Sequence, residues 1–438
     1  MAVSVLEQRA GVLVIGGGAA GLMAAIAAAR TGASVVLAEK GVRVGQKIRA
    51  TGNGRCNLSN LAIAGKGAGG RYNDPAFAAP VIRRYGCDEV RALFGGLGLL
   101  TEPDAKGWVF PGTRLAASVV DVLSNELGRL GVAVHTGCGI EGLSFTEGGA
   151  LAFAGAEGGT CRAGGGVAAP LAATGAESGA AAPLAAEGLA AEGEALRFVA
   201  RTVVVACGVG PLLHALEPHV LREPVAVLGP LATERPPLKG LDGVRARAAL
   251  TLAREGRELF REEGEVLFRP FGVSGIVSFD LSRFAEEGDV VQLDFFPSYD
   301  GRELASLLAA RHLQNPSDSL GRLLDGMLHP RLAQAVARAA AARPDTPPDR
   351  ALLEKVARVM KAYRLRVTAG PSLSQAQVTR GGLATEGFDA STLRSLHRPC
   401  LFAAGECLDV DGPCGGFNLH WAWASGYTAG TSAGSAAT

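Results

Sequence analysis

The sequence predicts an α/β protein in which one domain is built from both ends of the chain and is interrupted by a β-rich domain and a small helical domain. Three observations support this fold class. An apolar run, a glycine turn and a helical segment open the chain within residues 12–32, and the same order recurs within residues 401–430. Between them, short β-type runs fill residues 225–300, and apolar residues at helical spacing fill residues 302–362. The two ends are therefore expected to meet in one domain.

The composition is that of a large globular protein without a strong charge. The 438 residues are 48% hydrophobic, and 43 Lys and Arg stand against 42 Asp and Glu, which leaves a net charge of +1. This balance gives no general electrostatic reason for binding nucleic acid or an anionic membrane. We therefore expect a small-molecule substrate and neither a nucleic-acid nor a membrane partner. The oligomeric state is left open.

The cysteines and the interruption of an uncharged segment near the N-terminus indicate a cytoplasmic protein. Eight cysteines are scattered and no C-x-x-C occurs, so neither a metal site nor a dithiol motif is predicted, and a reduced compartment is the simplest interpretation. Residues 11–29 are uncharged and almost long enough to span a membrane. A triple glycine interrupts this segment after five residues, which fits strand, turn and helix better than one continuous helix.

The first of these segments carries the fingerprint of a dinucleotide-binding, Rossmann-like domain. The β-branched run 12–16 predicts a buried strand, and Gly16, Gly18 and Gly21 follow in the spacing G-x-G-x-x-G before an alanine-rich helix. Gly16 allows the tight turn, Gly18 lets a pyrophosphate approach the backbone, and Gly21 lets helix and strand pack closely. The start of the helix offers free N–H groups and a positive dipole to phosphates.

Glu39 completes this fingerprint at the end of the second predicted strand, residues 34–40. It lies about 20 residues past the glycines, where an acid accepts both ribose hydroxyls of a dinucleotide and repels a 2′-phosphate. Because strand, glycines, helix, strand and acid follow in order, we predict dinucleotide binding rather than an ordinary glycine turn. The fingerprint alone does not separate FAD from NAD.

Two further segments are expected at the same site. The loop 45–60 holds Lys47, Asn53, Arg55 and Asn57 directly after the acidic strand end, which places them near the pyrophosphate unless the loop is only a solvated surface. Near the chain's end, the apolar run LFAA leads into Gly405 and Glu406, then into a glycine turn and a last helix. In two-dinucleotide flavoproteins such a late acid binds the ribityl chain of FAD, so the last strand–turn–helix is expected to complete the site.

Four motifs together resemble the BaiN/YhiN-type flavoproteins, FAD-binding members of the glutathione-reductase-like, two-dinucleotide-binding superfamily. The motifs are ATGNGRCNLSN (50–60), GVSGIVSFDLSR (272–283), VTRGG (378–382) and the stretch 405–430. They are long, occur in the order typical of the family and frame nearly the whole chain. The resemblance implies a Rossmann-like FAD-binding domain interrupted by a β-rich domain and a small helical domain.

The expected domain limits follow from these motifs and from composition. Residues 1–210 and 366–438 would form the two parts of the FAD-binding domain, 211–300 the β-rich domain and 301–365 the helical domain. Residues 148–195 consist mostly of Gly, Ala, Glu, Pro and Leu and contain a short internal duplication. Because such a composition cannot build a packed core, we expect a disordered insertion within a hairpin there.

The resemblance also implies which positions hold FAD. The matching positions are Gly18, Ala19 and Ala20 at the pyrophosphate; Glu39 and Lys40 at the adenosine ribose; Lys47, Gly52, Asn53, Cys56 and Asn57 along the pyrophosphate and the flavin; and Glu406, Gly416, Phe417, Asn418 and Leu419 at the ribityl chain and the isoalloxazine ring. The turn and strand-end glycines Gly16, Gly21, Gly208 and Gly405 complete the set.

For the activity, the resemblance implies a cofactor more firmly than a substrate. Some family members resemble NAD(P)H-dependent reductases of C=C bonds in steroid-like bile acid intermediates, and others have been assigned as amine oxidases. We expect an FAD-dependent oxidoreductase that reduces a C=C bond of a small apolar substrate, steroid-like or enone, with electrons from NAD(P)H. The alternatives are an amine oxidase producing hydrogen peroxide, an RNA-modifying flavoprotein and a flavin-binding protein without catalysis. The near-zero net charge weighs against RNA.

Some positions depart from the pattern or carry two interpretations. Cys207 and Val209 replace the Thr and the second Gly of an Ala-Thr-Gly-Gly turn, and the segment that follows is shortened, which weighs against a direct NAD(P)H site. No catalytic constellation is evident, as expected where a cofactor supplies the chemistry. His420 could donate a proton to a substrate or position the flavin, and we favour positioning. Cys56 and Cys414 are expected to be packing or turn residues.

Overall fold

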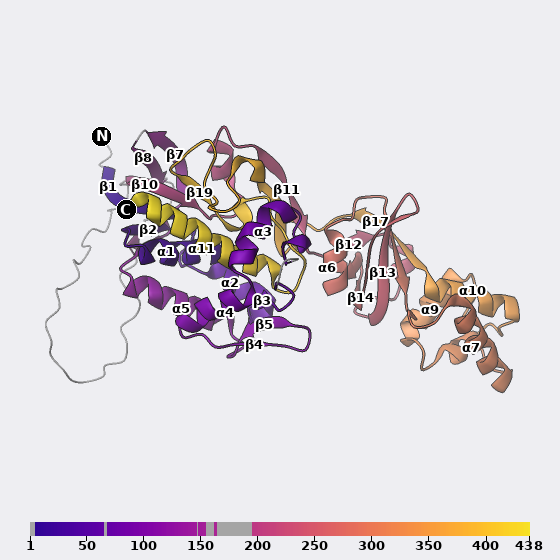
Figure 1. Ribbon diagram of the computed structural model, residues 1–438. Helices are drawn as coiled ribbons and strands as arrows, with labels where there is room; N and C mark the ends of the chain where they lie inside the picture. The colour runs from indigo at the N-terminus through magenta and orange to yellow at the C-terminus, as the bar shows by residue number, and fades with distance from the viewer. Residues whose placement is uncertain (1–4, 65–67, 147, 155–161, 164–194) are drawn as a thin grey trace. The chain divides into compact units, whose positions relative to one another are not determined.

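The computed structural model describes residues 5–64, 68–146, 148–154, 162–163 and 195–438, and close contacts divide the chain into two compact units. Unit 1 comprises Met1–Pro224 and Arg380–Thr438, and unit 2 comprises Val225–Thr379. The α/β fold class predicted from the sequence is confirmed, because unit 1 combines a parallel sheet with covering helices and draws on both chain ends (Figure 1).

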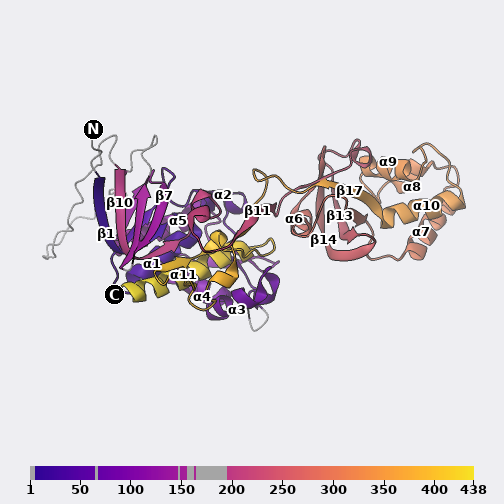
Figure 2. The same cartoon turned by 90° about the horizontal axis from the view of Figure 1, so that it is seen from above.

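A largely parallel sheet forms the centre of unit 1, and Figure 2 labels its strands β1, β10 and β7. The strand order is β7-β8-β10-β1-β2-β6-β9, with β19 also paired to β10. Its strands are β1 Val5–Ile15, β2 Val35–Ala38, β6 Ala133–Thr136, β7 Ile140–Thr146, β8 Gly149–Ala154, β9 Arg162–Ala163, β10 Ala195–Val205 and β19 Leu401–Ala403. Strands β10, β1, β2, β6 and β19 are parallel. Every residue of β2 is buried, as expected for a strand covered on both faces.

Two helices from opposite ends of the chain cover this sheet together. Helix α1 (Ala19–Arg30) and helix α11 (Phe417–Ala437) lie side by side, indigo beside yellow in Figure 1. Gly426, Gly430 and Gly434 recur every four residues on α11, and a Cβ atom at any of them would overlap an atom of α1 or of the turn after it. The glycines therefore let the two helix backbones approach closely.

Smaller elements of unit 1 surround the ends of these helices. The helices are α2 Gln46–Ala50, α3 Pro75–Arg84, α4 Cys87–Gly96 and α5 Ala116–Arg129, and the three-stranded sheet is β3 Ser59–Asn60, β5 Trp108–Pro111 and β4 Thr101–Pro103. Strands β11 (Leu221–Val227) and β18 (Val378–Leu383) form a two-stranded sheet. The chain passes from unit 1 to unit 2 within β11 and returns within β18.

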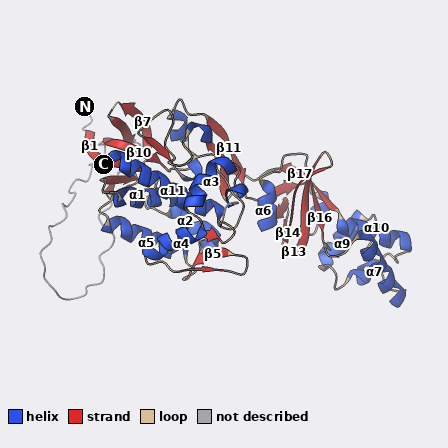
Figure 3. Ribbon diagram, viewed as in Figure 1, coloured by secondary structure: helices blue, strands red, loops and turns tan. Residues whose placement is uncertain are grey.

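Unit 2 joins a closed barrel to a group of helices (Figure 3). The barrel order is β12-β15-β14-β13-β16-β17, with bounds β12 Leu231–Thr233, β13 Arg245–Arg254, β14 Arg257–Arg269, β15 Gly272–Ser274, β16 Val290–Asp294 and β17 Tyr363–Ala369. The helices are α6 Ile276–Ser282, α7 Gly301–Gln314, α8 Leu320–Leu324, α9 Pro330–Ala339 and α10 Arg350–Lys361. One apolar core includes Leu250 and Val291 of the barrel and Leu304, Val336 and Val356 of the helices.

Three expectations differ from the structure in their limits. The boundary expected after residue 210 lies after Pro224. Residues 149–154, expected within the disordered insertion, form strand β8, whose Ala150, Ala152 and Ala154 are buried against the sheet. The expected boundary at residue 366 falls inside β17, which closes the barrel by pairing with β16. Most of the predicted insertion lies outside the described residues.

No helix in the described part of the chain combines the length and the apolar character that a bilayer crossing needs.

Candidate functional site

The first glycine turn has the geometry that a dinucleotide phosphate requires. Gly16 has φ +105°, and a Cβ atom there would lie 2.6 Å from the carbonyl oxygen of Ala206. At Gly21 a Cβ atom would overlap the carbonyl of Gly16, so only glycine lets the helix pack so closely. Gly18 begins α1 without a side-chain cap, and the position of its missing Cβ is open space. The uncapped helix start beside open space fits an anionic group.

Glu39 holds this turn from the end of β2. The backbone N–H groups of Gly17 and Gly41 donate to its two carboxylate oxygens at 2.6 Å each. A carboxylate oxygen can accept more than one hydrogen bond, so both oxygens keep capacity for ribose hydroxyls. Glu39 is therefore suited both to shape the loop and to bind a ribose, and sequence reasoning anticipated only the second role.

Three predicted residues from distant segments converge beside the turn. Lys47 on α2 places Nζ 3.8 Å from Oε2 of Glu406, and a Cβ atom on Gly208 would lie 3.8 Å from each of those two atoms. Burial raises the pKa of the Glu406 carboxyl, and Lys47 opposes that rise. Because residue 208 is a glycine, no side chain at that position covers the cation and the partly buried acid.

The predicted loop after α2 is built from unusual backbone conformations. Gly52, Asn53 and Cys56 have φ between 54° and 58°, in the left-handed region. Cys56 is buried, and burial raises its pKa to about 12, so the side chain is a thiol and packs rather than reacts. Lys40, Gly52 and Asn53 are exposed.

The loop before α11 is fastened to this N-terminal segment. With its amide oriented to match its neighbours, Asn57 donates to the carbonyls of Val109 and Ser59 and accepts from the N–H of Gly416. The amide of Asn60 donates to the carbonyl of Gly415 at 2.8 Å. Gly415 and Gly416 both have positive φ, near 97° and 99°. The last strand–turn–helix thus meets the segment that follows the first one.

Asn418 and its neighbours shape the loop itself. The N–H of Gly412 donates to Oδ1 of Asn418, and Nδ2 of Asn418 donates to the carbonyl of Gly412, each at 2.8 Å. Phe417 is buried and Leu419 half-buried. The side chain of Asn418 is therefore occupied in closing the loop.

His420 lies in the first turn of α11, and both of its ring nitrogens have hydrogen-bond partners. Nε2 is 2.9 Å from the carbonyl oxygen of Tyr85, which can only accept, so Nε2 carries the proton and Nδ1 accepts from the hydroxyl of Ser59 at 2.8 Å. The side chain is fully buried, and burial lowers its pKa to about 4. This geometry supports positioning, because neither nitrogen is available to a substrate.

Trp421 and Trp423 anchor the first turns of α11 in the core. Both side chains are buried, and their indole N–H groups donate to the carbonyls of Gly405 and Leu58 at 3.2 Å. The helix is thereby fixed to both loops of the candidate site.

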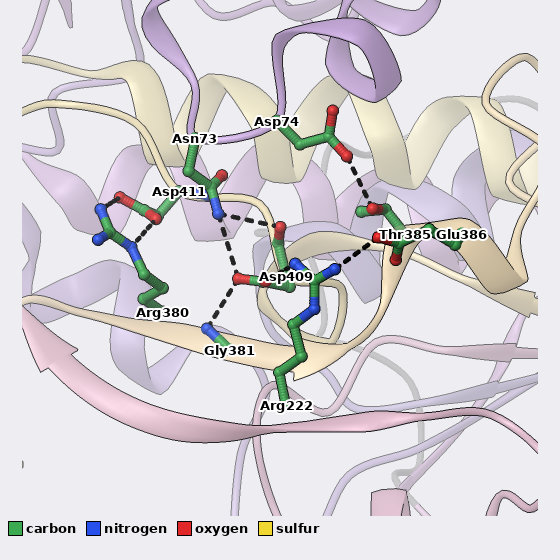
Figure 4. A network of polar contacts seen from close by, with 9 residues as sticks. All are labelled: Asn73, Asp74, Arg222, Arg380, Gly381, Thr385, Glu386, Asp409 and Asp411. Atoms are coloured by element: carbon green, nitrogen blue, oxygen red, sulfur yellow. Dashed lines mark hydrogen bonds and ion pairs between the residues drawn. The ribbon is translucent and has the colours of Figure 1, made fainter.

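A network of polar side chains that sequence reasoning did not identify braces the same loop (Figure 4). Asp411 is fully buried, and Arg380 donates to both of its oxygens, at 2.6 and 3.1 Å. Asp409 accepts from Arg222 at 2.8 Å and from the N–H of Gly381 at 2.9 Å. Arg222 and Arg380 lie on β11 and β18, where the chain leaves and re-enters unit 1.

Residues just before α3 and just after β18 complete this network. The side-chain oxygen of Asn73 accepts from the backbone N–H of Asp411, while its amide nitrogen donates to Asp409. Thr385 donates to Asp74 at 2.7 Å, and Arg222 also contacts Glu386. The signal for the network was the D-x-D pair inside the 405–430 motif, whose partners are remote in sequence.

The described residues contain no group of three or more His, Cys, Asp and Glu side chains arranged to hold a metal ion. The chemical capacity of the site is therefore that of its glycine turns, its two acids and Lys47.

The chain is similar to known proteins over nearly its whole length. Residues 10–432 match the model of the HI0933-like protein Rossmann domain. The chain is 31% identical to the 3-dehydro-bile acid delta(4,6)-reductase of Clostridium scindens, over 96% of this chain and 98% of that protein. It is 26% identical to the ribosomal RNA dihydrouridine synthase of Escherichia coli, over 96% and 97%. Among solved structures, 3-ketosteroid delta1-dehydrogenase from Sterolibacterium denitrificans is 12% identical over 98% of this chain and 99% of that chain, with a TM-score of 0.48.

Proposed function

The chain belongs to the HI0933-like Rossmann-domain family, and from that premise we propose that it is an FAD-dependent oxidoreductase that reduces a C=C bond of its substrate. The observation that carries this proposal is the meeting of both chain ends at one place. The open start of α1 at Gly18, the Lys47–Gly208–Glu406 group and the loop at Gly416 are the parts that an extended dinucleotide needs.

We propose the following division of work among these residues. The N–H groups at the start of α1 bind the pyrophosphate, with Ala19 and Ala20 in the first turn. Glu39 accepts the ribose hydroxyls, and Glu406 accepts those of the ribityl chain. The backbone from Gly416 to Leu419 faces the flavin ring. Bound FAD supplies the two-electron chemistry, while the chain binds it, orients it and excludes water.

The substrate class is proposed from the chemistry that two relatives share. The Clostridium scindens relative is named for delta(4,6) double bonds of a 3-dehydro-bile acid, and the Escherichia coli relative for dihydrouridine in ribosomal RNA. Dihydrouridine is uridine with its ring C=C bond reduced, so both names describe the reduction of a ring C=C bond. We propose a small apolar substrate, steroid-like or enone, because the relative named for a bile acid has the higher identity.

NAD(P)H is the proposed electron source, and a cytoplasmic location accords with it. The segment after β10 is short, because only a 3₁₀ turn, Pro211–Ala215, follows Gly210. This short segment weighs against a direct NAD(P)H site and makes the electron donor a point to test. The alternative is an amine oxidase, which would form hydrogen peroxide without added nicotinamide. A protein that binds flavin without catalysis would keep its flavin oxidised with every donor.

A substrate test separates these possibilities. The flavin is reduced anaerobically with dithionite, excess reductant is removed, and a 3-oxo-Δ4 steroid is added under argon. Return of the oxidised flavin spectrum together with loss of the enone absorbance supports the proposal. In a second sample, amines replace dithionite and air is then admitted; reduction of the flavin by an amine, followed by reoxidation with formation of peroxide, would replace the proposal with the oxidase.

RNA is the second candidate substrate, and the distribution of charge favours it. Residues 301–362 contain ten Lys and Arg but only six Asp and Glu, although the whole chain carries a net charge of only +1. The net charge therefore conceals a basic segment, and the sequence argument against nucleic acid does not hold for this part of the chain.

A further inference from the structure

Helices α9 and α10 of unit 2 border a hollow lined by cations. Its volume is about 810 Å³, and its charged lining consists of Arg338, Arg343, Lys355 and Arg358. No carboxylate belongs to the lining. Lys355 and Arg358 are three residues apart on α10 and therefore lie on one face of that helix.

These four cations are exposed and form no ion pair within the described part of the chain. Asp345 lies two residues from Arg343 along the sequence but is exposed and outside the lining. The two acids at α10 are engaged elsewhere. Asp349 caps α10 by accepting from the N–H of Leu352, and Glu354 pairs with Arg350. Like charges around one hollow repel one another, so an external anion would relieve that repulsion.

The basic surface continues beyond this hollow. Arg338 donates from Nη2 to the carbonyl of Lys239 at 2.6 Å, and Lys239 lines a second hollow of about 490 Å³ together with Arg235. Asp242 is the acid in that second lining. Two adjoining hollows with six cations suit a run of phosphates better than one phosphate ion.

We propose that this surface, formed by Arg235, Lys239, Arg338, Arg343, Lys355 and Arg358, binds the phosphate backbone of RNA. The proposal deepens the second candidate function and rests on it for the role of RNA. The linings contain no aromatic side chain on which a base could stack. The surface therefore binds with little sequence preference and with strong dependence on salt.

The test measures RNA binding by the full-length, FAD-loaded protein. A fluorescein-labelled RNA hairpin of about 16 base pairs is titrated by fluorescence anisotropy, with KCl varied from about 50 to about 200 mM. The variant pair K355Q/R358Q removes two lining cations. The matched control is R257Q/R364Q, which removes two exposed arginines of the barrel; Arg257 lies at the turn between β13 and β14, at the end of that hairpin remote from Asp242 and Pro270.

The expected result is tight, salt-sensitive binding by the native protein. K355Q/R358Q weakens it about tenfold at low salt and lowers the slope of log affinity against log salt by about 1.5. The control pair changes neither quantity. No binding at about 50 mM KCl, or equal losses in both pairs, would overturn the proposal.

Anionic vesicles of phosphatidylglycerol and phosphatidylcholine provide the contrasting partner. If the lining pair lost vesicle binding while RNA binding stayed unchanged, the surface would be a membrane site and the proposal wrong. Because RNA binding is read without turnover, its failure is distinguishable from a failure of FAD binding, which the flavin spectrum of the same sample reports.

Discussion

At the scale of single residues, the candidate site contains groups suited to face a ligand and groups that hold the loops in place. Glu406 and Lys47 are of the first kind, since within the described part of the chain their charged atoms form an ion pair only with each other. Glu39 both holds the first turn and can face a ligand. Asn418 and His420 hold loops in place. The distinction decides which substitutions should change ligand affinity and which should change stability.

Substituting Glu406→Gln should weaken FAD binding without unfolding the protein. The amide keeps the shape but loses the charge that strengthens a hydrogen bond to a ribityl hydroxyl, a loss of about 1.5 kcal/mol, or about tenfold in Kd. Flavin fluorescence quenching measures the affinity. Glu141→Gln, an exposed position on β7, is the matched control and should leave the affinity unchanged. Equal affinity in all three proteins would remove Glu406 from the ligand.

His420 predicts a specific loss of stability in acid. Its pKa is about 4 in the folded protein and about 6.5 when unfolded, so the unfolded chain takes up a proton first as the pH falls. The contribution is fully present above the unfolded value and is lost between about pH 6.5 and pH 4. From about pH 7.5 to pH 5 the loss is about 2 kcal/mol.

Urea unfolding at those two pH values tests this assignment. His420→Gln retains one donor and one acceptor but cannot titrate, so the pH-dependent loss should shrink by about 2 kcal/mol. His214→Gln, at an exposed position, should keep the full loss. An undiminished loss in His420→Gln would mean that the histidine does not titrate as its burial requires.

At the scale of elements, the α1–α11 contact depends on glycine rather than on large apolar side chains. A Cβ atom at position 430 would overlap the carbonyl of Ala24. Gly430→Ala should therefore destabilise the protein by about 2 kcal/mol, despite the better helix propensity of alanine. Gly95→Ala on α4, where the Cβ position is open, should stabilise it by about 0.5 to 1 kcal/mol. Opposite signs in thermal unfolding support the close packing, whereas stabilisation by both would contradict it.

The strands β11 and β18 are held to the loop before α11 by the two arginine–aspartate pairs. Asp411 is fully buried, so Asp411→Asn should remove the carboxylate charge that Arg380 contacts at 2.6 Å and cost about 3 kcal/mol. Asp121→Asn breaks the exposed contact with Arg49 and should cost less than about 1 kcal/mol. Denaturant midpoints compare the two. Similar small effects would show that the buried pair adds nothing to the loop's stability.

Local patterns and remote partners differ in how far the sequence could predict them. The turn at Gly16, Gly18 and Gly21 was predictable because its geometry depends on residues only five apart. Arg222 and Asp409 are 187 residues apart, and such an ion pair leaves no local pattern. The barrel limit at β17 was missed for the same reason, because barrel closure depends on a remote strand.

At the scale of the whole molecule, net charge and composition were the least informative signals. The net charge of +1 is a sum over all 438 residues, so it does not reveal the excess of basic residues in 301–362. The meeting of both chain ends was predictable only because the strand–glycine–helix order occurs twice. The central claim is that this meeting creates one FAD site in a reductase.

The most direct measurement of that claim is the visible spectrum of the purified protein under argon, before and after NADH and then NADPH. The account predicts a yellow protein with oxidised-flavin bands that bleach with at least one nicotinamide. A colourless protein that cannot be loaded with FAD would contradict the account.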